Sequence, residues 1–467
     1  MTDATNTTNT TNTVGTAGTA ARDLAARVRG AVHAPGSPGH ERAGTGVQLL
    51  NPHRPAAVVE AAGADDVRAA VAWAAGHGLP VAVQATGHGR GTGLAGGVLV
   101  ATHRMDGVRV DPARRTARIG AGATWRRVIG AAAPHGLAPL SGSAPSVGAV
   151  GYTLGGGVGL LARRYGFAAD HVRRVDLVTA DGTARTVTAD TDPELFWALR
   201  GGGGDLGIVT AMEVDLFPVE RLYGGGLLFD LGGDPARVLG AWWDWTRDLP
   251  EEMTSGVSLI AYPDLPGLPP HLRGRHLARV AVSWSGPVDA GPLLVEPLRS
   301  AGPLLEDTTG ALPYTRSGEV FADPDEPAAF RGEGLLLDDL PVEDAAAAAV
   351  RAAEAPFMSV MSLRHLGGAL SRPPRVPGAV GHRGATAALT LLTLDGSRDT
   401  PAMADLRAST TRALAGRTLG RSLTLSFGEM DPSLVRTAFS PADHARLVGL
   451  RGRLDPRGLV HSHRPLR

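Results

Sequence analysis

The sequence predicts an α+β fold with two units, a mixed helix-and-strand half followed by an antiparallel sheet covered by helices. Short helical and strand patterns intermingle up to Pro218, without the regular alternation of a doubly wound sheet. After Pro218, apolar runs typical of strands follow one another with helical stretches between them. The chain has 467 residues, which is long for one domain, and 43% of them are hydrophobic, which suffices for a large core.

The elements of the first half follow from periodicity and from capping residues. Apolar residues at helical spacing predict helices, one of them with Asp65 or Asp66 as its N-cap, and Asp-Pro and Asp-Gly pairs mark the turns of two hairpins. In chain order we expect a helix over 64–78, a strand over 79–86, a hairpin over 108–122, a helix over 124–136, a hairpin over 173–189, a helix over 192–200 and a strand over 208–218.

The second half alternates strand-like and helical stretches. Strands are expected over 224–230, 256–262, 278–284, 357–366 and 385–394, and helices over 234–249, 342–355 and 399–416. A last helix is expected within 440–458, with Pro441 in its first turn. We therefore expect an inserted domain over 219–428 and a return of residues 429–467 to the first domain.

Charge and patterning exclude several classes of protein. The formal net charge is zero, with 46 basic and 46 acidic residues, so no field of one sign favours nucleic acid or a charged membrane surface. We find no run of 18 apolar residues and no secretion signal, which favours a cytoplasmic protein without a membrane span. Residues 1–22 are polar and of low complexity, and we expect a disordered tail there.

The sequence contains neither Cys nor Lys. Their absence removes thiol nucleophiles, zinc held by Cys, Schiff bases on Lys and the lysine of a P-loop. A serine hydrolase is also disfavoured, because the chain has no G-x-S-x-G elbow. His, Ser, Thr, Tyr and carboxylate side chains remain as candidate reactive groups.

Glycine motifs point to a phosphate ligand but away from a nicotinamide dinucleotide. Gly91, Gly93 and Gly96 match G-x-G-x-x-G, as do the glycines of 202–207, yet each match is followed by a predicted strand instead of the helix that pyrophosphate needs. Three glycine clusters, 87–97, 142–159 and 201–207, each adjoin a regular element. Such clusters can be mobile loops, but three braced ones in one domain favour an elongated phosphate-bearing ligand wrapped by backbone N–H groups.

Longer motifs identify a family. The chain resembles the berberine-bridge-enzyme-like branch of the vanillyl-alcohol-oxidase-type flavoproteins, and the resemblance runs from about Leu24 to Leu466. The stretches that carry it are "NPHRPAAVVEAA", "LPVAVQATGHG", "GAGATWRRV", "GLAPLSGSAPSVGAVGYTLGGGVGLLARRYG", "LVTADG", "LFWALRGGGGDLGIVTAMEV", "LRHLGGAL" and "LRGRLDPRGL". The resemblance implies a PCMH-type, two-part FAD-binding domain over 23–218 and 429–467, with the substrate-binding domain inserted between the parts.

By the same resemblance, His88 is the residue bonded to the 8α carbon of a covalently attached FAD. Many relatives have a second link from a Cys, but Ala144 stands at that position here, so only the link through His88 is expected. Val147 matches a position where a small residue accompanies access of O2. The cofactor-binding residues implied are Thr86, Gly87, His88, Gly89, Arg90, Gly91, Ser143, Ala144, Val147, Gly148, Gly151, Tyr152, Gly157, Gly207, Ile208, Val209 and His463.

The function implied is that of an FAD-dependent oxidase. A small-molecule alcohol, amine or secondary metabolite gives hydride to flavin N5, and O2 reoxidises the flavin to yield H2O2. A flavin-dependent cyclase or isomerase without net oxidation is the alternative, and a flavin-binding protein without catalysis is a further one. The protein is expected to be a monomer or a homodimer.

The proton acceptor is harder to name. His365 and Tyr152 are the candidate catalytic residues, and Tyr314, Glu429 and His382 are weaker ones. This chain departs from the family pattern near the site: Asp205, Thr424, Ser426 and His463 replace residues common in relatives, and Phe427 lacks a hydroxyl. The "HSH" at 461–463 has no carboxylate partner in sequence, so we expect no metal.

Overall fold

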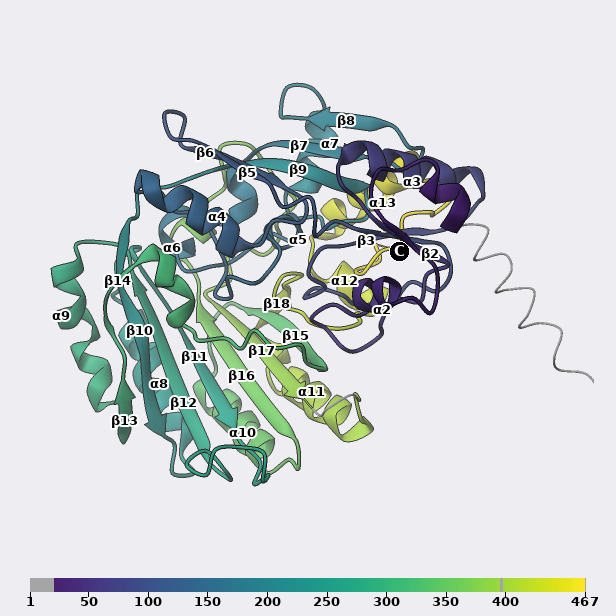
Figure 1. Ribbon diagram of the computed structural model, residues 1–467. Helices are drawn as coiled ribbons and strands as arrows, with labels where there is room; N and C mark the ends of the chain where they lie inside the picture. The colour runs from purple at the N-terminus through teal and green to yellow at the C-terminus, as the bar shows by residue number, and fades with distance from the viewer. Residues whose placement is uncertain (1–20, 395–397, 467) are drawn as a thin grey trace, which may run out of the picture.

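The computed structural model describes residues 21–394 and 398–466, and it confirms the α+β fold (Figure 1). Two lobes lie side by side. The N-terminal lobe holds the sheets formed before residue 216, and the sheet lobe holds one large sheet formed by residues 221–421. The final segment of the chain returns to the N-terminal lobe, where Val460 forms a β-bridge with Val81. The predicted tail lies mostly outside the described residues.

The N-terminal lobe contains two separate sheets. A four-stranded sheet has the order β1-β2-β4-β3, in which β2, β4 and β3 run parallel and β1 is antiparallel. Its strands are β1 (Val32–His33), β2 (Ala57–Glu60), β3 (Val81–Gln84) and β4 (Val98–Ala101). A five-stranded antiparallel sheet has the order β5-β6-β9-β7-β8. Its strands are β5 (Val108–Asp111), β6 (Thr116–Gly120), β7 (Val172–Val178), β8 (Ala184–Val187) and β9 (Ile208–Asp215).

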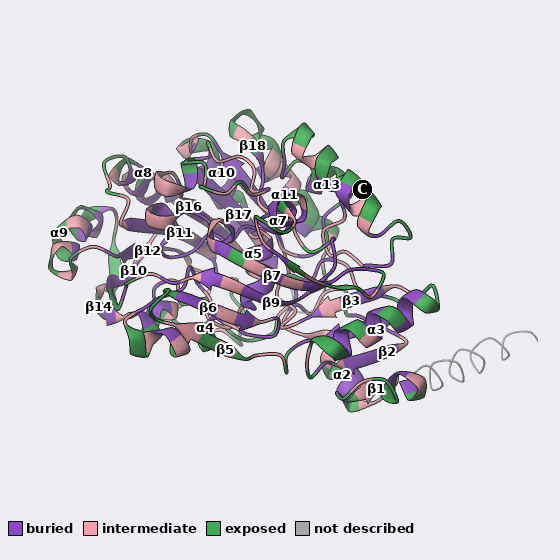
Figure 2. Ribbon diagram, turned by 90° about the horizontal axis from the view of Figure 1, so that it is seen from above, coloured by how far each residue is buried: buried purple, intermediate pink, exposed green. Residues whose placement is uncertain are grey.

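Helices surround these two sheets. They are α2 (Pro38–Thr45), α3 (Ala64–Gly76), α4 (Trp125–Ala132), α5 (Ala149–Leu154), α6 (Ala162–Tyr165), α7 (Pro193–Leu199), α12 (Pro432–Arg436) and α13 (Pro441–Leu454), with 3-10 turns η1 (Ala133–His135) and η2 (Ala168–His171). In Figure 2 the strands are largely buried, whereas the outward faces of α3 and α13 are exposed. This pattern is typical of amphipathic helices that cover a sheet.

The sheet lobe is built on nine strands, antiparallel wherever they pair. Eight follow the order β13-β10-β12-β11-β16-β17-β15-β18, and β14 also pairs with β10. They are β10 (Arg221–Asp230), β11 (Met253–Ala261), β12 (His276–Trp284), β13 (Leu304–Asp307), β14 (Gly310–Pro313), β15 (Phe330–Leu337), β16 (Met358–His365), β17 (Ala387–Leu394) and β18 (Thr418–Arg421). The accompanying helices are α8 (Pro235–Thr246), α9 (Gly291–Val295), α10 (Val342–Ala353) and α11 (Pro401–Ala413), with 3-10 turns η3 (Val288–Ala290), η4 (Glu296–Ser300), η5 (Tyr314–Glu319), η6 (Gly368–Ser371) and η7 (Ala415–Arg417).

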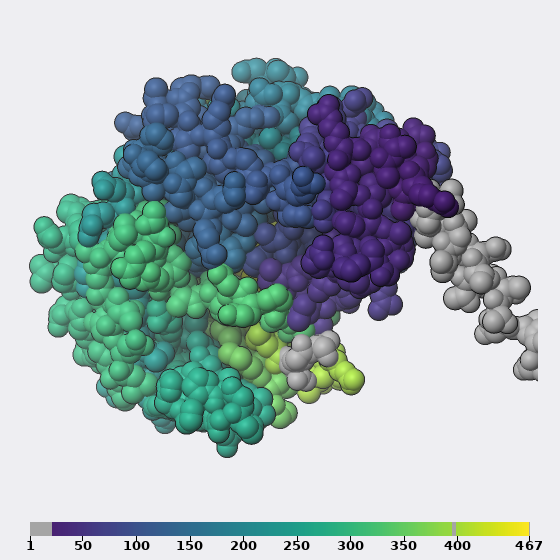
Figure 3. Space-filling model, viewed as in Figure 1, coloured from purple at the N-terminus to yellow at the C-terminus, as the bar shows by residue number. Residues whose placement is uncertain are grey.

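The two faces of the nine-stranded sheet have different neighbours. On the helix face, side chains such as Val257 and Leu363 form one core with Trp242 of α8 and Ala349 of α10. Because side chains alternate along a strand, the intervening residues point to the opposite side, which we call the cleft face. The cleft face carries Ser258, Arg279, Ser362 and Arg364, and it faces the N-terminal lobe. Figure 3 shows the surface hollowed where the two lobes meet.

Most elements expected from the sequence are present, including the strands β4 and β9 that follow the two G-x-G-x-x-G matches. One capping prediction is wrong. Gly63 is the N-cap of α3, while the Asp66 carboxylate accepts hydrogen bonds from the backbone N–H groups of Arg29, Gly30 and Ala62. The Asp66 carboxylate satisfies three backbone amides at this position. It therefore stabilises the fold more than it would by capping its own helix. No helix in the described part of the chain is long and apolar enough to cross a membrane.

Candidate functional site

Three glycine-rich loops, far apart in the sequence, meet at one edge of the N-terminal lobe. The loop after β3 lies against the second loop, because a methyl group at Gly148 would lie 3.6 Å from Ala85 Cβ and from Thr86 Oγ1. The third loop joins them through the Gly203 N–H, which donates to the carbonyl of Leu154 at 3.0 Å. The structure therefore brings together the three clusters that the sequence marked as phosphate-binding.

His88 lies in the first of these loops and is held by its neighbour. Its Nδ1 forms a hydrogen bond with Oγ1 of Thr86 at 2.8 Å. Burial lowers the pKa of His88 below its ordinary value, and the charge of Asp325 only partly opposes this shift. A neutral imidazole whose Nδ1 is engaged keeps Nε2 as the ring nitrogen available to another group.

Tyr152 lies in the second loop, in a slot lined by glycines. Methyl groups at Gly142 and Gly157 would lie 2.9 and 2.5 Å from its ring, and one at Gly159 would lie 3.0 Å from its hydroxyl oxygen. The ring packs edge-on against Trp125, with ring centroids 5.5 Å apart. Residues with a Cβ would not leave this space, so the glycines of the second loop are required by the aromatic ring.

One hydroxyl group of the second loop, that of Tyr152, is buried without a hydrogen-bond partner among the described residues. Burial raises the pKa of Tyr152, so its phenol remains protonated and keeps a donor to offer. Because buried polar groups are normally satisfied, an orphaned hydroxyl in this loop fits a site that a polar ligand such as a flavin completes.

Arg90 is fully buried, and the two terminal nitrogens of its guanidinium form hydrogen bonds within the protein. It donates to the carbonyls of Gly44, Thr45, Gln48 and Leu50 and to the Gln84 side chain, which ties the first loop to residues 44–50. In this predicted cofactor residue, Nη1 and Nη2 are engaged by the protein, while Nε has no hydrogen-bond partner among the described residues.

The third loop is shaped by one glycine and anchored by one carboxylate. Gly207 has a φ of 144°, and a methyl group there would lie 2.7 Å from the carbonyl oxygen of Val178. Ile208 and Val209 follow as the buried first residues of β9. Asp205 accepts from the Leu466 N–H at 3.2 Å and from the Ser462 hydroxyl, so it fastens the end of the chain to this loop.

His463 approaches the first loop through the same C-terminal segment. Its Nδ1 lies 3.2 Å from the Thr92 carbonyl oxygen, and its ring centroid lies 5.4 Å from that of His53 and 5.6 Å from that of His461. Burial and the neighbouring His461 lower the pKa of His463 to about 4. Within the described ranges, no group of three His, Asp or Glu residues is arranged to hold a metal ion.

The structure places His365 away from these loops. It lies on the helix face of β16, where its Nε2 contacts Nη1 of Arg163 at 2.5 Å and its ring packs against Trp243. Burial and the Arg163 charge lower the pKa of His365 to about 3. Its neighbour Arg364 points to the cleft face instead and donates through Nη2 to the Ser143 hydroxyl at 3.0 Å. Arg364 is not among the site residues predicted from the sequence, although its even spacing with Ser362 indicates a polar strand face.

The weaker candidates are held mostly by structural contacts. The Tyr314 hydroxyl donates to the Pro139 carbonyl and meets Ser141, and His382 contacts the Thr437 carbonyl. Thr424 joins the Gly155 carbonyl to the Gly157 N–H, which supports the second loop. Glu429 lines a cavity of about 390 Å³ beside Thr92 and Gly93.

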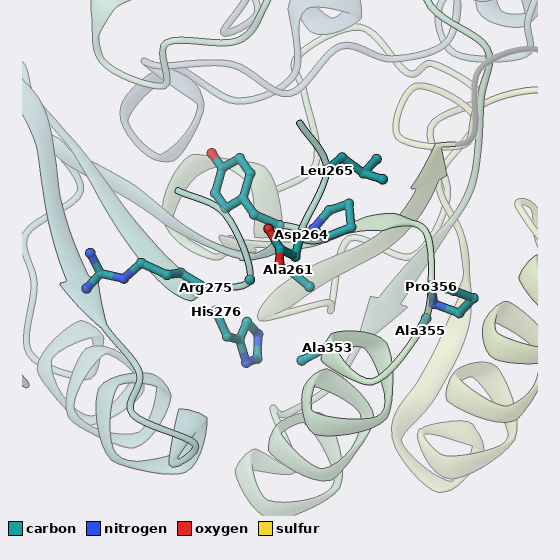
Figure 4. A pocket seen from close by; sticks show the side chains of 11 residues that line it. Ala261, Asp264, Leu265, Arg275, His276, Ala353, Ala355 and Pro356 are labelled. Carbon is teal, nitrogen blue, oxygen red and sulfur yellow. The ribbon is translucent and has the colours of Figure 1, made fainter. Parts of the chain in front are cut away.

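Another cavity, of about 360 Å³, lies beside the β11–β12 turn and the end of α10 (Figure 4). Tyr262, Asp264, Arg275 and His276 line it, and it contains none of the predicted site residues. We do not assign it to the cofactor.

Comparison with known proteins agrees with this geometry. Residues 55–188 match the FAD binding domain family. The chain is 39% identical over 171 residues to (R)-6-hydroxynicotine oxidase of Paenarthrobacter nicotinovorans (36% of this chain, 37% of the relative) and 31% identical over 216 residues to xylooligosaccharide oxidase of Thermothelomyces thermophilus (44% of each). These alignments span less than half the length of either relative.

Solved structures extend the likeness to the fold of the whole chain. 6-Hydroxy-D-nicotine oxidase of Arthrobacter nicotinovorans superposes with a TM-score of 0.81 at 24% identity, covering 94% of this chain and 97% of that one. BBE-like 1 of Physcomitrella patens gives a TM-score of 0.80 at 17% identity, covering 96% and 99%. The chain thus carries an FAD binding domain on the fold of the berberine-bridge-enzyme-like flavoproteins, and the resemblance inferred from its motifs is confirmed.

Proposed function

We propose that this chain is an FAD-dependent oxidase that takes hydride from a small-molecule alcohol, amine or secondary metabolite. The observation that carries the proposal is His88, a neutral, partly buried imidazole in a glycine-rich loop of an FAD binding domain. When bound, FAD supplies the electron acceptor for the substrate and passes the electrons to O2, which yields H2O2. The named relatives that are oxidases support the same reaction class.

His88 is proposed to hold FAD covalently through Nε2. Because Nδ1 is engaged by Thr86, the lone pair that can attack lies on Nε2. The new bond replaces one C–H bond of the 8α methyl group and the imidazole N–H. The two electrons and two protons released reduce O2 to H2O2, so the balance needs no further reactant.

The other loops are proposed to bind the remainder of the cofactor without covalent bonds. Backbone N–H groups of the glycine clusters suit the pyrophosphate, and the orphaned hydroxyl of Tyr152 suits a polar atom of the ring or its side chain. Gly87, Gly89 and Gly91 allow close approach in the first loop, and His463 closes this loop from the C-terminal segment.

The geometry favours different roles for the two candidate catalytic residues. Tyr152 presents a free, protonated hydroxyl within the loops and is proposed to contact the cofactor or the reacting ligand. His365 is proposed as a positioning residue, since its Nε2 faces the Arg163 guanidinium on the helix face. We therefore expect the group that accepts the substrate proton to lie on the cleft face.

Peroxide formation and the flavin spectrum test the proposal together. A panel of alcohols and amines is mixed with the purified protein under air, and H2O2 is measured. The active compound is then added without oxygen. In an oxidase, the absorbance of the visible flavin bands should fall when the compound is added and return when air is admitted. Turnover without this loss of absorbance and without peroxide would establish the cyclase or isomerase alternative.

A further inference from the structure

We propose that Arg364 recognises a carboxylate group of the substrate, which places the substrate among small organic acids. This inference deepens the proposed oxidase function and rests on it. Arg364 belongs to β16, the strand at the middle of the nine-stranded sheet, and it is the residue of the cleft face that reaches a predicted cofactor loop through Ser143. A ligand held by Arg364 therefore lies between the sheet and the flavin loops.

The local packing shapes a place for the guanidinium. Arg364 pairs across the sheet with Gly256 of β11. A methyl group at Gly256 would lie 3.1 Å from the Phe321 ring, so only glycine lets this ring settle over the sheet. The guanidinium of Arg364 then stacks on Phe321, with its central carbon 4.4 Å from the ring centroid. Stacking fixes the plane of the guanidinium and leaves its edge to hydrogen-bond partners.

The charge of Arg364 lacks a counter-charge. Arg364 is half-buried, yet across the described residues none of the ion pairs within 4.0 Å includes it, and the Ser143 hydroxyl is its sole side-chain hydrogen-bond partner. A half-buried cation without an anion is unfavourable, and a bound carboxylate would relieve this through two parallel hydrogen bonds.

Other arginines show that this arrangement is unusual in the chain. Arg279, on the same face of β12, donates through Nη2 to the carbonyls of Glu319 and Val320 at the end of η5. The buried Arg163 and Arg200 each donate to several carbonyls. Those guanidiniums hold the chain together, whereas Arg364 keeps most of its donors for a ligand.

The surroundings favour a carboxylate over a phosphate. Near Arg364 the cleft face offers neutral hydroxyls. Ser258 and Ser362 form a hydrogen bond of 2.8 Å, and Ser362 lies two residues before Arg364 on the same strand. The chain has no Lys, and Arg279 on the same face donates to backbone carbonyls. Arg364 with neutral donors beside it therefore balances a single negative charge. The Phe321 ring beside it suits a planar apolar group next to the carboxylate.

Benzoate, a planar carboxylate, is the probe for this inference. Titration calorimetry of the purified full chain with benzoate is compared for the wild type, Arg364→Gln and Arg364→Lys. We expect saturable binding by the wild type, binding at least about tenfold weaker in Arg364→Gln, and an intermediate affinity in Arg364→Lys, since Lys keeps the charge but loses the bidentate geometry. Thermal melting confirms that each variant is folded.

Two matched variants separate recognition from structure. Arg279→Gln removes a guanidinium from the same face, and Arg364→Lys keeps the charge at the proposed site. Arg279→Gln should retain benzoate affinity within about threefold of wild type. Equal binding by folded Arg364→Gln and wild type, or no binding by wild type, would overturn the inference. Flavin content, measured separately, reports on the oxidase proposal, so failure of one is distinguishable from failure of the other.

Discussion

Oγ1 of Thr86 lies 2.8 Å from Nδ1 of His88, two residues further along a loop that begins at the end of β3. This hydrogen bond orients an imidazole that burial keeps neutral. It leaves Nε2 as the reactive nitrogen. The orientation and tautomer of the His88 ring therefore depend on a hydroxyl group that mutation can remove.

Thr86→Ala should slow covalent attachment of flavin about fivefold, because loss of a hydrogen bond worth about 1 kcal/mol frees the ring to rotate and to change tautomer. Thr86→Ser keeps the hydroxyl and is the matched control. The measurement is the time course of protein-bound flavin after FAD is added to flavin-free protein. Identical time courses for the Ala and Ser variants would show that the contact has no part in attachment.

Tyr152→Phe should stabilise the ligand-free protein by about 1 kcal/mol, since it removes a buried hydroxyl that has no partner in the described structure. The same change should weaken exchangeable FAD binding about fivefold in a His88→Ala background, because the cofactor loses one hydrogen bond. Chemical unfolding and an FAD titration measure the two effects. A destabilised Tyr152→Phe protein would mean that the hydroxyl is already satisfied within the chain.

Gly157→Ala should destabilise the protein by about 2–4 kcal/mol. Gly157 has a φ of 77°, and its new methyl group would lie 2.5 Å from the Tyr152 ring and 2.8 Å from Ala168 Cβ. Gly151→Ala is the control, because nothing lies within 4 Å of that position in α5 and alanine favours a helix by about 0.5–1 kcal/mol. Urea unfolding of both variants should give shifts of opposite sign.

Stability should fall as pH is lowered from 7 to 5. Burial lowers the pKa of His53 to about 2 and that of His365 to about 3, whereas both titrate near 6.5 in the unfolded chain. The unfolded state therefore binds more protons below pH 6.5, and each histidine contributes a loss of about 2 kcal/mol by pH 5. Urea midpoints at pH 7, 6 and 5 measure this.

His365→Gln should reduce that loss by about 2 kcal/mol, because glutamine does not titrate. If wild type and His365→Gln lose stability equally between pH 7 and 5, the histidine is not buried in its neutral form. The comparison reports on the His365 environment independently of any activity.

Local patterns predicted much of the fold. Helices such as α3 and α8 and hairpins with Asp-Gly or Asp-Pro turns follow from periodicity and turn chemistry, and their boundaries agree within a few residues. Strand β15 was missed because Arg331, Glu333 and two glycines interrupt its apolar pattern. Only the pairing with β17 and β18 makes these residues a strand, and pairing partners are distant in sequence.

The site was predicted in part, for similar reasons. Long motifs indicated the loops around His88 and Tyr152, and the structure brings these loops together. Which of His365 and Arg364 faces the cleft depends on the register of β16, and that register is fixed by β11 and β17. The role of Asp66 depends on a loop 36 residues away. The domain boundaries and the roles of the site residues stay predictions.

Acid precipitation of the purified protein tests the link at His88 most directly. The wild-type pellet should be yellow after washing, because the flavin is bonded to the chain, and a tryptic peptide containing His88 should carry the added mass. His88→Ala should leave a colourless pellet and a yellow supernatant. A wild-type protein that releases all of its flavin into the supernatant, or that never binds flavin, would contradict the central claim.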